Sequence, residues 1–138
     1  MPDFTAAEAA QVLADNFAPW VLALGIRVDT IATDAATLRI PADPRLCRVG
    51  GIMCGQSLAS GADTAMVIAL AVAQRGLKPL TTVDMSINFM RPIAGTDAVL
   101  DARVMRLGKS LAFCTCEIRS GEGGKPAAFA TGTYAILA

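Results

Sequence analysis

The sequence predicts a single α+β domain, residues 1–138, in which an antiparallel sheet of about five or six strands wraps around one long helix. Residues 55–73 are small or apolar apart from a few polar positions and one charge, Asp63, which is typical of a helix buried in a core. The segments on either side alternate apolar and polar residues with the period of two that strands have. Because one helix cannot cover both faces of a sheet, we expect the sheet to curl around it.

A short amphipathic helix is expected to open the fold. Residues 5–18 place apolar side chains at helical spacing, and Thr5 and Glu8 have the spacing of a capping box. Segments 26–31 and 36–40 then alternate apolar and polar residues with a short break between them. This pattern predicts a β-hairpin.

The long helix and the remaining strands follow the hairpin. Residues 41–51 contain two prolines and end in adjacent glycines, which predicts a loop before a helix over about residues 54–75. We expect Gly76 to cap the end of this helix. Turn residues then separate four alternating segments, which we expect to be strands: 80–90, 98–106, 111–119 and 127–137.

The composition narrows the possible partners and the location. Lys plus Arg and Asp plus Glu both number 12, so no long-range field attracts nucleic acid or an acidic membrane surface. The chain is 54% hydrophobic, and burying that much apolar surface favours a homo-oligomer. The apolar stretch 65–73 is well short of the ~20 residues that span a membrane. The acidic start lacks the features of a signal peptide, so we expect a cytoplasmic protein.

The four cysteines do not have the spacing of a metal site. Cys47 and Cys54 are separated by six residues, Cys114 and Cys116 by one, and the chain contains no histidine. We therefore expect no bound metal. On a strand Cys114 and Cys116 would share one face, which favours a role as small core residues.

Asp63 is the first candidate for a catalytic residue. A lone carboxylate in apolar surroundings must face water at a site, find a partner, or bear a desolvation cost of several kcal/mol. The alternative to a catalytic role is a buried acid bonded to the backbone or to an arginine.

Four segments carry a resemblance to a known family. They are the start of the long helix through Ala62-Asp-Thr-Ala65, the strand end Asn88-Phe-Met-Arg-Pro92, the turn Gly108-Lys-Ser110, and Ala130-Thr-Gly-Thr-Tyr134. In this order the chain, from about Gly25 to the C-terminus, resembles the hotdog-fold acyl-CoA thioesterases of the PaaI-like, phenylacetate-degradation type.

The resemblance implies a catalytic arrangement. The backbone N–H of Gly55, at the positive end of the long helix, would polarise the thioester carbonyl. Asp63, nine residues after Cys54, would act as general base or as nucleophile. Thr82 matches a hydroxyl that positions water in some relatives. The resemblance further implies a dimer or a dimer of dimers, with each site completed by the neighbouring subunit.

This chain departs from the family at the entrance of the site. Cys54 stands where the family has a histidine, and Gln56 stands where it has a second glycine. Arg48 replaces an asparagine that often helps hold the thioester oxygen. Arg48 could supply a charged donor or could pair with Asp63 and silence it. A covalent mechanism at Cys54 would need a nearby base that no histidine supplies, so packing is its favoured role.

The remaining candidates concern substrate binding. The resemblance implies that Arg91 and the turn residues hold coenzyme A, although these could equally be solvated charges. An acyl lining of Met53, Met66, Phe89 and Met90 would accept aryl or medium aliphatic chains. The candidate substrate-binding residues are Arg48, Cys54, Gln56, Thr64, Phe89, Arg91, Gly108, Lys109 and Ser110.

The leading hypothesis is hydrolysis of an aryl or short- to medium-chain acyl-CoA, with no cofactor because coenzyme A is part of the substrate. Asp63, Thr64 and Thr82 favour this reading. The alternative is a non-catalytic acyl-CoA-binding module of the same fold, which Arg48 and Cys54 favour. A dehydratase of this fold would normally need a histidine.

Overall fold

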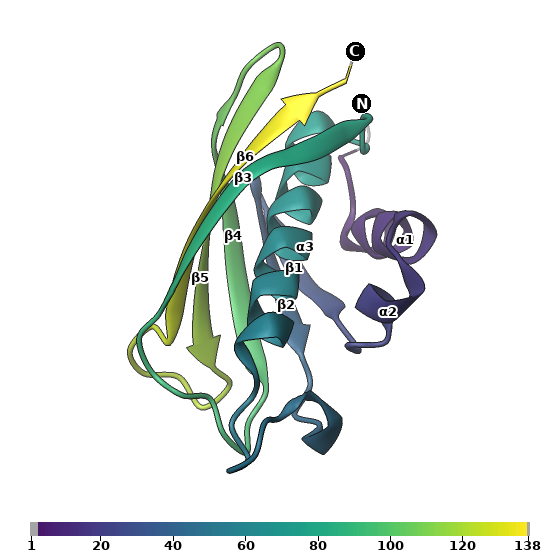
Figure 1. Cartoon of the computed structure of the whole chain (residues 1–138). Coiled ribbons are helices and arrows are strands. Elements are labelled where there is room, and N and C mark those ends of the chain that lie inside the picture. The colour runs from purple at the N-terminus through teal and green to yellow at the C-terminus, as the bar shows by residue number, and fades with distance from the viewer. Residues whose placement is uncertain (1–2, 138) are drawn as a thin grey trace.

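A computed structural model describes residues 3–137. Helix α1 (Ala6–Asn16) begins at the predicted capping box, in which the Thr5 hydroxyl accepts the Glu8 N–H and the Glu8 carboxylate accepts the Thr5 N–H. A short helix that the sequence reading missed, α2 (Pro19–Leu22), follows it. Both helices lie on the side of the long helix that faces away from the sheet (Figure 1).

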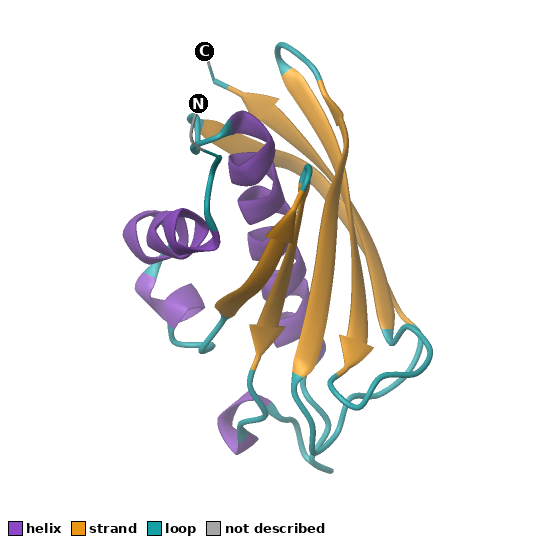
Figure 2. Cartoon of the chain, turned by 180° about the vertical axis from the view of Figure 1, so that it is seen from behind, coloured by secondary structure: helices purple, strands orange, loops and turns teal. Residues whose placement is uncertain are grey.

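The sheet has six antiparallel strands in the order β1-β2-β4-β5-β6-β3, and it curls around one long helix as predicted (Figures 1 and 2). That helix is α3 (Gly55–Gln74). A single 3-10 turn at Pro44–Leu46 interrupts the predicted loop before it. The strands are β1 (Arg27–Ala32), β2 (Ala35–Ile40), β3 (Leu80–Phe89), β4 (Ala98–Leu107), β5 (Leu111–Ser120) and β6 (Ala128–Ile136).

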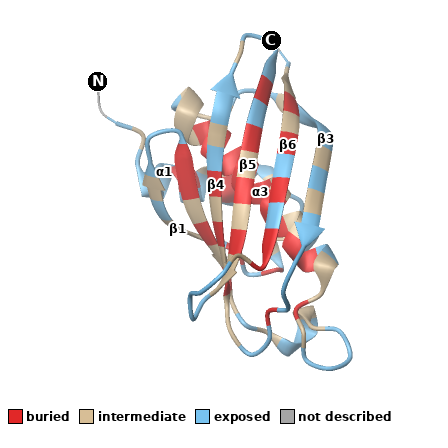
Figure 3. Ribbon diagram, turned by 90° about the vertical axis from the view of Figure 1, so that its left-hand side faces the viewer, coloured by how far each residue is buried: buried red, intermediate tan, exposed pale blue. Residues whose placement is uncertain are grey.

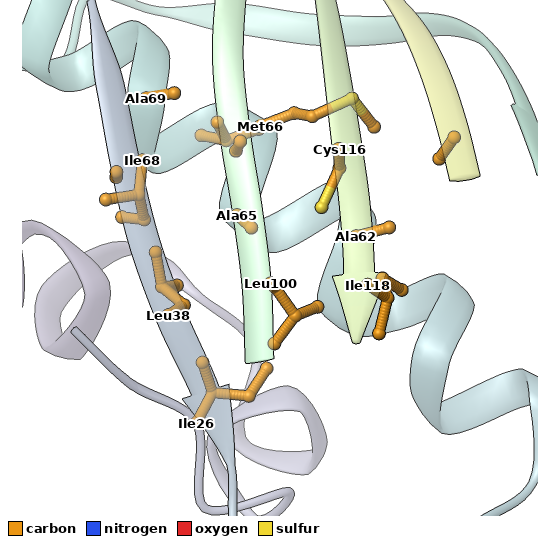
Figure 4. Packing of buried hydrophobic residues seen from close by; sticks show 14 of the residues in the cluster. Ile26, Leu38, Ala62, Ala65, Met66, Ile68, Ala69, Leu100, Cys116 and Ile118 are labelled. Carbon is orange, nitrogen blue, oxygen red and sulfur yellow. The ribbon is translucent and has the colours of Figure 1, made fainter. Parts of the chain in front are cut away.

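Small residues on α3 allow the helix to approach the sheet closely. Ala62 and Ala65 are fully buried, and their side chains lie beneath Leu100 and neighbouring apolar residues of the sheet (Figure 4). A Cβ atom on Gly61 would lie 2.6 Å from Ile40 Cδ1 and 2.9 Å from Leu100 Cδ2. Although α3 is long and apolar enough to cross a membrane, 67% of its apolar window is buried in the fold. It is therefore the core helix that the sequence predicted.

The end of α3 differs from the prediction. Arg75 is the left-handed residue that caps the helix, with φ of 55°, and Gly76 after it also has a positive φ, of 132°. Gly76 follows it and donates its N–H to Ala71 O at 2.9 Å, which closes a Schellman motif. The motif needs a left-handed residue followed by a residue whose N–H donates back to the last turn of the helix. Arg75 and Gly76 fill these two positions, because the helix ends at Gln74.

Strand β3 is an edge strand that the described chain leaves largely uncovered. It pairs only with β6, and most of its side chains are exposed (Figure 3). Val83 and Phe89 are 58% and 51% exposed, respectively. A strand with a free hydrogen-bonding edge and exposed apolar side chains is a surface suited to pairing with another chain.

The two cysteines of β5 make stability depend on pH. Cys114 and Cys116 are buried as predicted, and burial raises the pKa of Cys114 to about 12 and that of Cys116 further. An unfolded cysteine ionises at about pH 8.5. Because the folded pKa values are higher, ionisation of the thiols above that pH favours the unfolded state. The stability that the two buried thiols contribute is therefore complete below that pH and is lost as the pH rises above it. We expect the urea midpoint to fall between about pH 8 and pH 10.

A variant with Cys114→Ala and Cys116→Ala should lose much of this pH dependence, whatever its stability at neutral pH. Chemical unfolding at several pH values and one protein concentration tests the expectation. An equally steep decline in the variant would show that other groups cause the loss.

Candidate active site

Two hydroxyl groups hold the carboxylate of Asp63, which is half-buried on α3. The Tyr134 hydroxyl donates to Oδ1 at 2.8 Å. The Thr82 hydroxyl lies 3.1 Å from Oδ1 and 3.4 Å from Oδ2. Asp63 is therefore a carboxylate with two neutral side-chain donors, and its alternative role as an acid paired with an arginine does not fit the described structure.

The strand register brings the two hydroxyls together. Thr82 on β3 lies directly opposite Tyr134 on β6, so both side chains share the inner face of the sheet. A β-bulge between Thr82 and Asp84 makes this possible. Strict alternation would point Thr82 away from the face that Met85 and Ile87 occupy, whereas the extra residue at Val83 restores it to that face.

Tyr134 is the site residue that sequence reasoning missed. It is fully buried, and its ring lies against Gly132, where a Cβ atom would come within 2.8 Å of Tyr134 Cε2. Burial raises the pKa of Tyr134 well above its usual range, and the charge of Asp63 raises it further. The hydroxyl thus remains a proton donor. The sequence feature that could have identified Tyr134 is a tyrosine on the inner face of a strand, two residues after a glycine.

A cavity of about 550 Å³ opens beside Asp63 and Thr82. Most of its remaining wall is apolar and comes from the end of α1, the middle of α3 and the segment that leads into β3: Phe17, Val67, Leu77, Pro79 and Leu80. The predicted acyl lining does not surround this cavity: Met66 is fully buried beneath the sheet, and the other three residues line a separate cavity at the N-terminal end of α3, namely Met53, Phe89 and Met90. Asn16, Lys78 and Thr81 complete the wall, so the carboxylate sits beside a space with both apolar and polar surfaces.

A second cavity, of about 390 Å³, lies at the N-terminal end of α3. Arg48, Gly55, Phe89 and Arg91 contribute to its wall. Gly55 is the first residue of the helix, so its N–H has no partner within the helix. A Cβ atom on Gly55 would lie 3.3 Å from the Phe89 ring. A glycine here lets a group in the cavity reach a helix N-terminus that favours negative charge.

The two cavities share none of their lining residues. Gly55 and Asp63 are eight residues apart on one helix, which separates them by roughly 12 Å along its axis. One chain consequently does not present the Gly55 N–H and the Asp63 carboxylate to the same bond.

The residues that replace family positions have local partners. Arg48 donates to Val49 O at 3.2 Å and lines the cavity at Gly55, so it does not pair with Asp63 in the described chain. The Cys54 sulfur lies 3.1 Å from the Ser57 hydroxyl. Burial acts to raise the pKa of Cys54, but hydrogen bonds from Ser57 and nearby backbone N–H groups outweigh it and lower the pKa. Gln56 is exposed at the helix start.

The remaining predicted binding residues have other hydrogen-bond partners or lie at the far end of the sheet. Thr64 is buried and donates to Ser60 O at 2.8 Å, so its hydroxyl serves the helix. Arg91 donates to Pro126 O at 2.6 Å near the start of α3. Gly108, Lys109 and Ser110 form the β4–β5 turn at the opposite end of the sheet (Figure 1). Within residues 3–137, no three Cys, Asp or Glu side chains gather as metal ligands.

A family model described as Thioesterase superfamily matches residues 50–127, which include α3 with Asp63 and the edge strand β3 with Thr82. The chain belongs to the thioesterase superfamily. Acyl-coenzyme A thioesterase 13 from Homo sapiens is 36% identical over 76 residues, or 54% of this chain and 54% of that protein. The chain thus spans about half the length of the curated relatives it matches.

Solved structures confirm the hotdog fold over nearly the whole chain. Zebra fish thioesterase superfamily member 2 has a TM-score of 0.84 at 25% identity, covering 96% of this chain and 99% of its own. A mutant of the phenylacetic acid degradation protein PaaI from Thermus thermophilus has a TM-score of 0.75 at 27% identity, covering 87% of this chain and 100% of its own. The resemblance to PaaI proteins seen in the sequence is confirmed.

Gly132→Ala should destabilise this thioesterase-superfamily chain by roughly 1–3 kcal/mol, because the added methyl group overpacks the Tyr134 ring and Met66 Cε, 2.8 Å and 3.0 Å from the new atom. Urea unfolding measures the change. Thr131→Ala, at the adjacent exposed position of β6, is the matched control. Equal stability of the two variants would contradict the close packing at Gly132.

Proposed function

We propose that the protein hydrolyses acyl-CoA thioesters to a carboxylic acid and free coenzyme A. The carrying observation is the Asp63 carboxylate, held by two hydroxyls at the wall of a cavity that is apolar on part of its surface. A group held in this way is positioned to activate water or to attack an acyl carbon. Membership of the thioesterase superfamily and the named activity of the human relative support the same reaction.

We further propose that each active site combines two subunits of a dimer or of a dimer of dimers. The separation of Gly55 from Asp63 along one helix means that one chain cannot bring both groups to one thioester. The free edge of β3, with apolar side chains exposed along it, is a suitable surface for a second copy. Pairing across this edge would place Gly55 of one subunit opposite Asp63 of another.

The proposed chemistry proceeds through a tetrahedral intermediate. Asp63 takes a proton from water as the water oxygen bonds to the acyl carbon, and the resulting oxyanion accepts the Gly55 N–H. The intermediate then collapses, the carbon–sulfur bond breaks, and the thiolate of coenzyme A receives a proton. Alternatively, the Asp63 carboxylate displaces the thiolate to form an anhydride, which water hydrolyses. Neither route requires a cofactor.

The cavity at Asp63 suggests the class of acyl group. Its volume and the apolar part of its wall suit an aryl or a short- to medium-chain acyl group. For the coenzyme A portion we propose contacts from Arg48, Gln56, Phe89 and Arg91 near Gly55, and from Gly108, Lys109 and Ser110 of the β4–β5 turn. Arg91 and that turn lie at opposite ends of one chain, so contacts from both would require two subunits. We place the reaction in the cytoplasm.

Two positions favour a second candidate, an acyl-CoA-binding module without turnover. Arg48 and Cys54 stand where the family usually has an asparagine and a histidine, and neither hydrogen bonds to Asp63 in the described chain. Loss of an oxyanion donor would reduce the rate and leave binding intact.

Asp63→Asn should lower kcat for thiol release at least ~10²-fold, because the amide can neither accept a proton nor attack the acyl carbon. A panel of aryl, short-chain and medium-chain acyl-CoA esters, with free thiol as the readout, measures this. Asp34→Asn is the matched control, since Asp34 is exposed in the β1–β2 turn. Binding of acyl-CoA without turnover by the parent protein would favour the binding module instead.

Mixed oligomers test the shared site. Gly55→Pro removes the backbone N–H, and proline is well tolerated at the first position of a helix. The preceding residue, Cys54, has ψ of 150°, an extended conformation that is compatible with a following proline. Each variant alone should be nearly inactive. Mixed dimers of Asp63→Asn and Gly55→Pro subunits should recover roughly half of the parental activity, because one of their two sites is intact.

Co-expression with two affinity tags and sequential purification isolates the mixed dimers. As the control, the same procedure isolates dimers in which both subunits carry the same substitution but different tags. Inactive mixed dimers would contradict a site shared between subunits.

A further inference from the structure

The hydrogen bonds to Asp63 are unequal for its two oxygens. Oδ1 accepts the Tyr134 hydroxyl at 2.8 Å and the Thr82 hydroxyl at 3.1 Å. The shortest side-chain contact to Oδ2 is the 3.4 Å distance to the same Thr82 hydroxyl. With two donors on Oδ1, the lone pairs of Oδ2 are left for a ligand in the cavity.

The surroundings of Tyr134 favour a fixed position for this donor. The residue lies on β6, which is bonded on both sides, to β5 and to β3. Its ring is fully buried, and the missing side chain of Gly132 provides the space that it occupies. Thr82, by contrast, is an exposed residue of the edge strand. The rigid donor is therefore Tyr134.

We propose that Tyr134 is a positioning residue that holds Asp63 Oδ1 and so makes Oδ2 the oxygen that acts on water or on the thioester. The inference rests on the proposed function. A carboxylate on a helix can rotate about its Cβ–Cγ bond, and a donor fixed to one oxygen stops that rotation. Because Tyr134 is fully buried, it does not touch the substrate, and its effect reaches the reaction only through Asp63.

This arrangement predicts a particular kinetic signature. Tyr134→Phe keeps the ring and removes the donor, so we expect kcat to fall about 10- to 100-fold with little change in KM. A purely structural role would lower the melting temperature and leave both quantities unchanged.

A matched control removes the same kind of interaction elsewhere. The Thr37 hydroxyl donates to Asp101 Oδ1 at 2.7 Å between β2 and β4. Thr37→Val therefore deletes one hydroxyl donor to a carboxylate outside the proposed site. We expect parental kcat and KM for this variant.

A second measurement does not depend on turnover. Tyr134 is the single tyrosine of the chain, so tyrosinate absorbance reports on this group alone. The negative charge of Asp63 opposes ionisation of Tyr134. We expect tyrosinate to form at lower pH in Asp63→Asn than in the parent, over the pH range in which circular dichroism shows both to be folded.

The outcomes separate this inference from the proposed function. Turnover by the parent, together with an unchanged kcat in Tyr134→Phe, would overturn the inference alone. Identical tyrosine titrations in the parent and in Asp63→Asn would overturn the contact on which it rests. A parent that hydrolyses no acyl-CoA would refute the proposed function and the catalytic role of Tyr134, while the titration would still decide whether Tyr134 holds Asp63.

Discussion

Close packing of α3 against the curled sheet is the constraint on which the rest of this structure depends. The helix approaches closely because Gly61, Ala62 and Ala65 present almost no side-chain volume to the strands above them. Larger residues from the sheet, such as Ile40 and Leu100, fill the space that remains. This packing sets the depth at which the helix carries its one charged residue.

The depth of the helix determines the chemistry around that charge. Asp63 is half-buried, so water alone does not solvate it, and the sheet supplies two hydroxyl donors. Hydroxyls leave the carboxylate with its charge and with free lone pairs, whereas an arginine would neutralise it. A carboxylate held in this way beside a partly apolar cavity is consistent with the proposed role in acyl transfer.

The same helix also explains why one chain offers half of the proposed site. Its N-terminal N–H and its carboxylate lie in separate cavities because a rigid helix fixes the distance between them. The edge strand β3 contributes to both cavities, through Thr82 and Phe89, and its other edge is free in the single chain. In the proposed assembly, one uncovered strand would thus serve both dimerisation and the active site.

The sequence by itself determined the α+β class, the core helix, the strand segments and the candidate Asp63, because these follow from periodicity and from the cost of burying a charge. The tertiary structure decided the partners of Asp63. Tyr134 lies 71 residues from it along the chain, and only the strand register brings the two together. The bulge at Val83 turns the Thr82 side chain toward the inner face of the sheet, whereas strict alternation along the strand would place it on the outer face. Contacts of this kind depend on strand pairing across the fold, which local patterns do not encode.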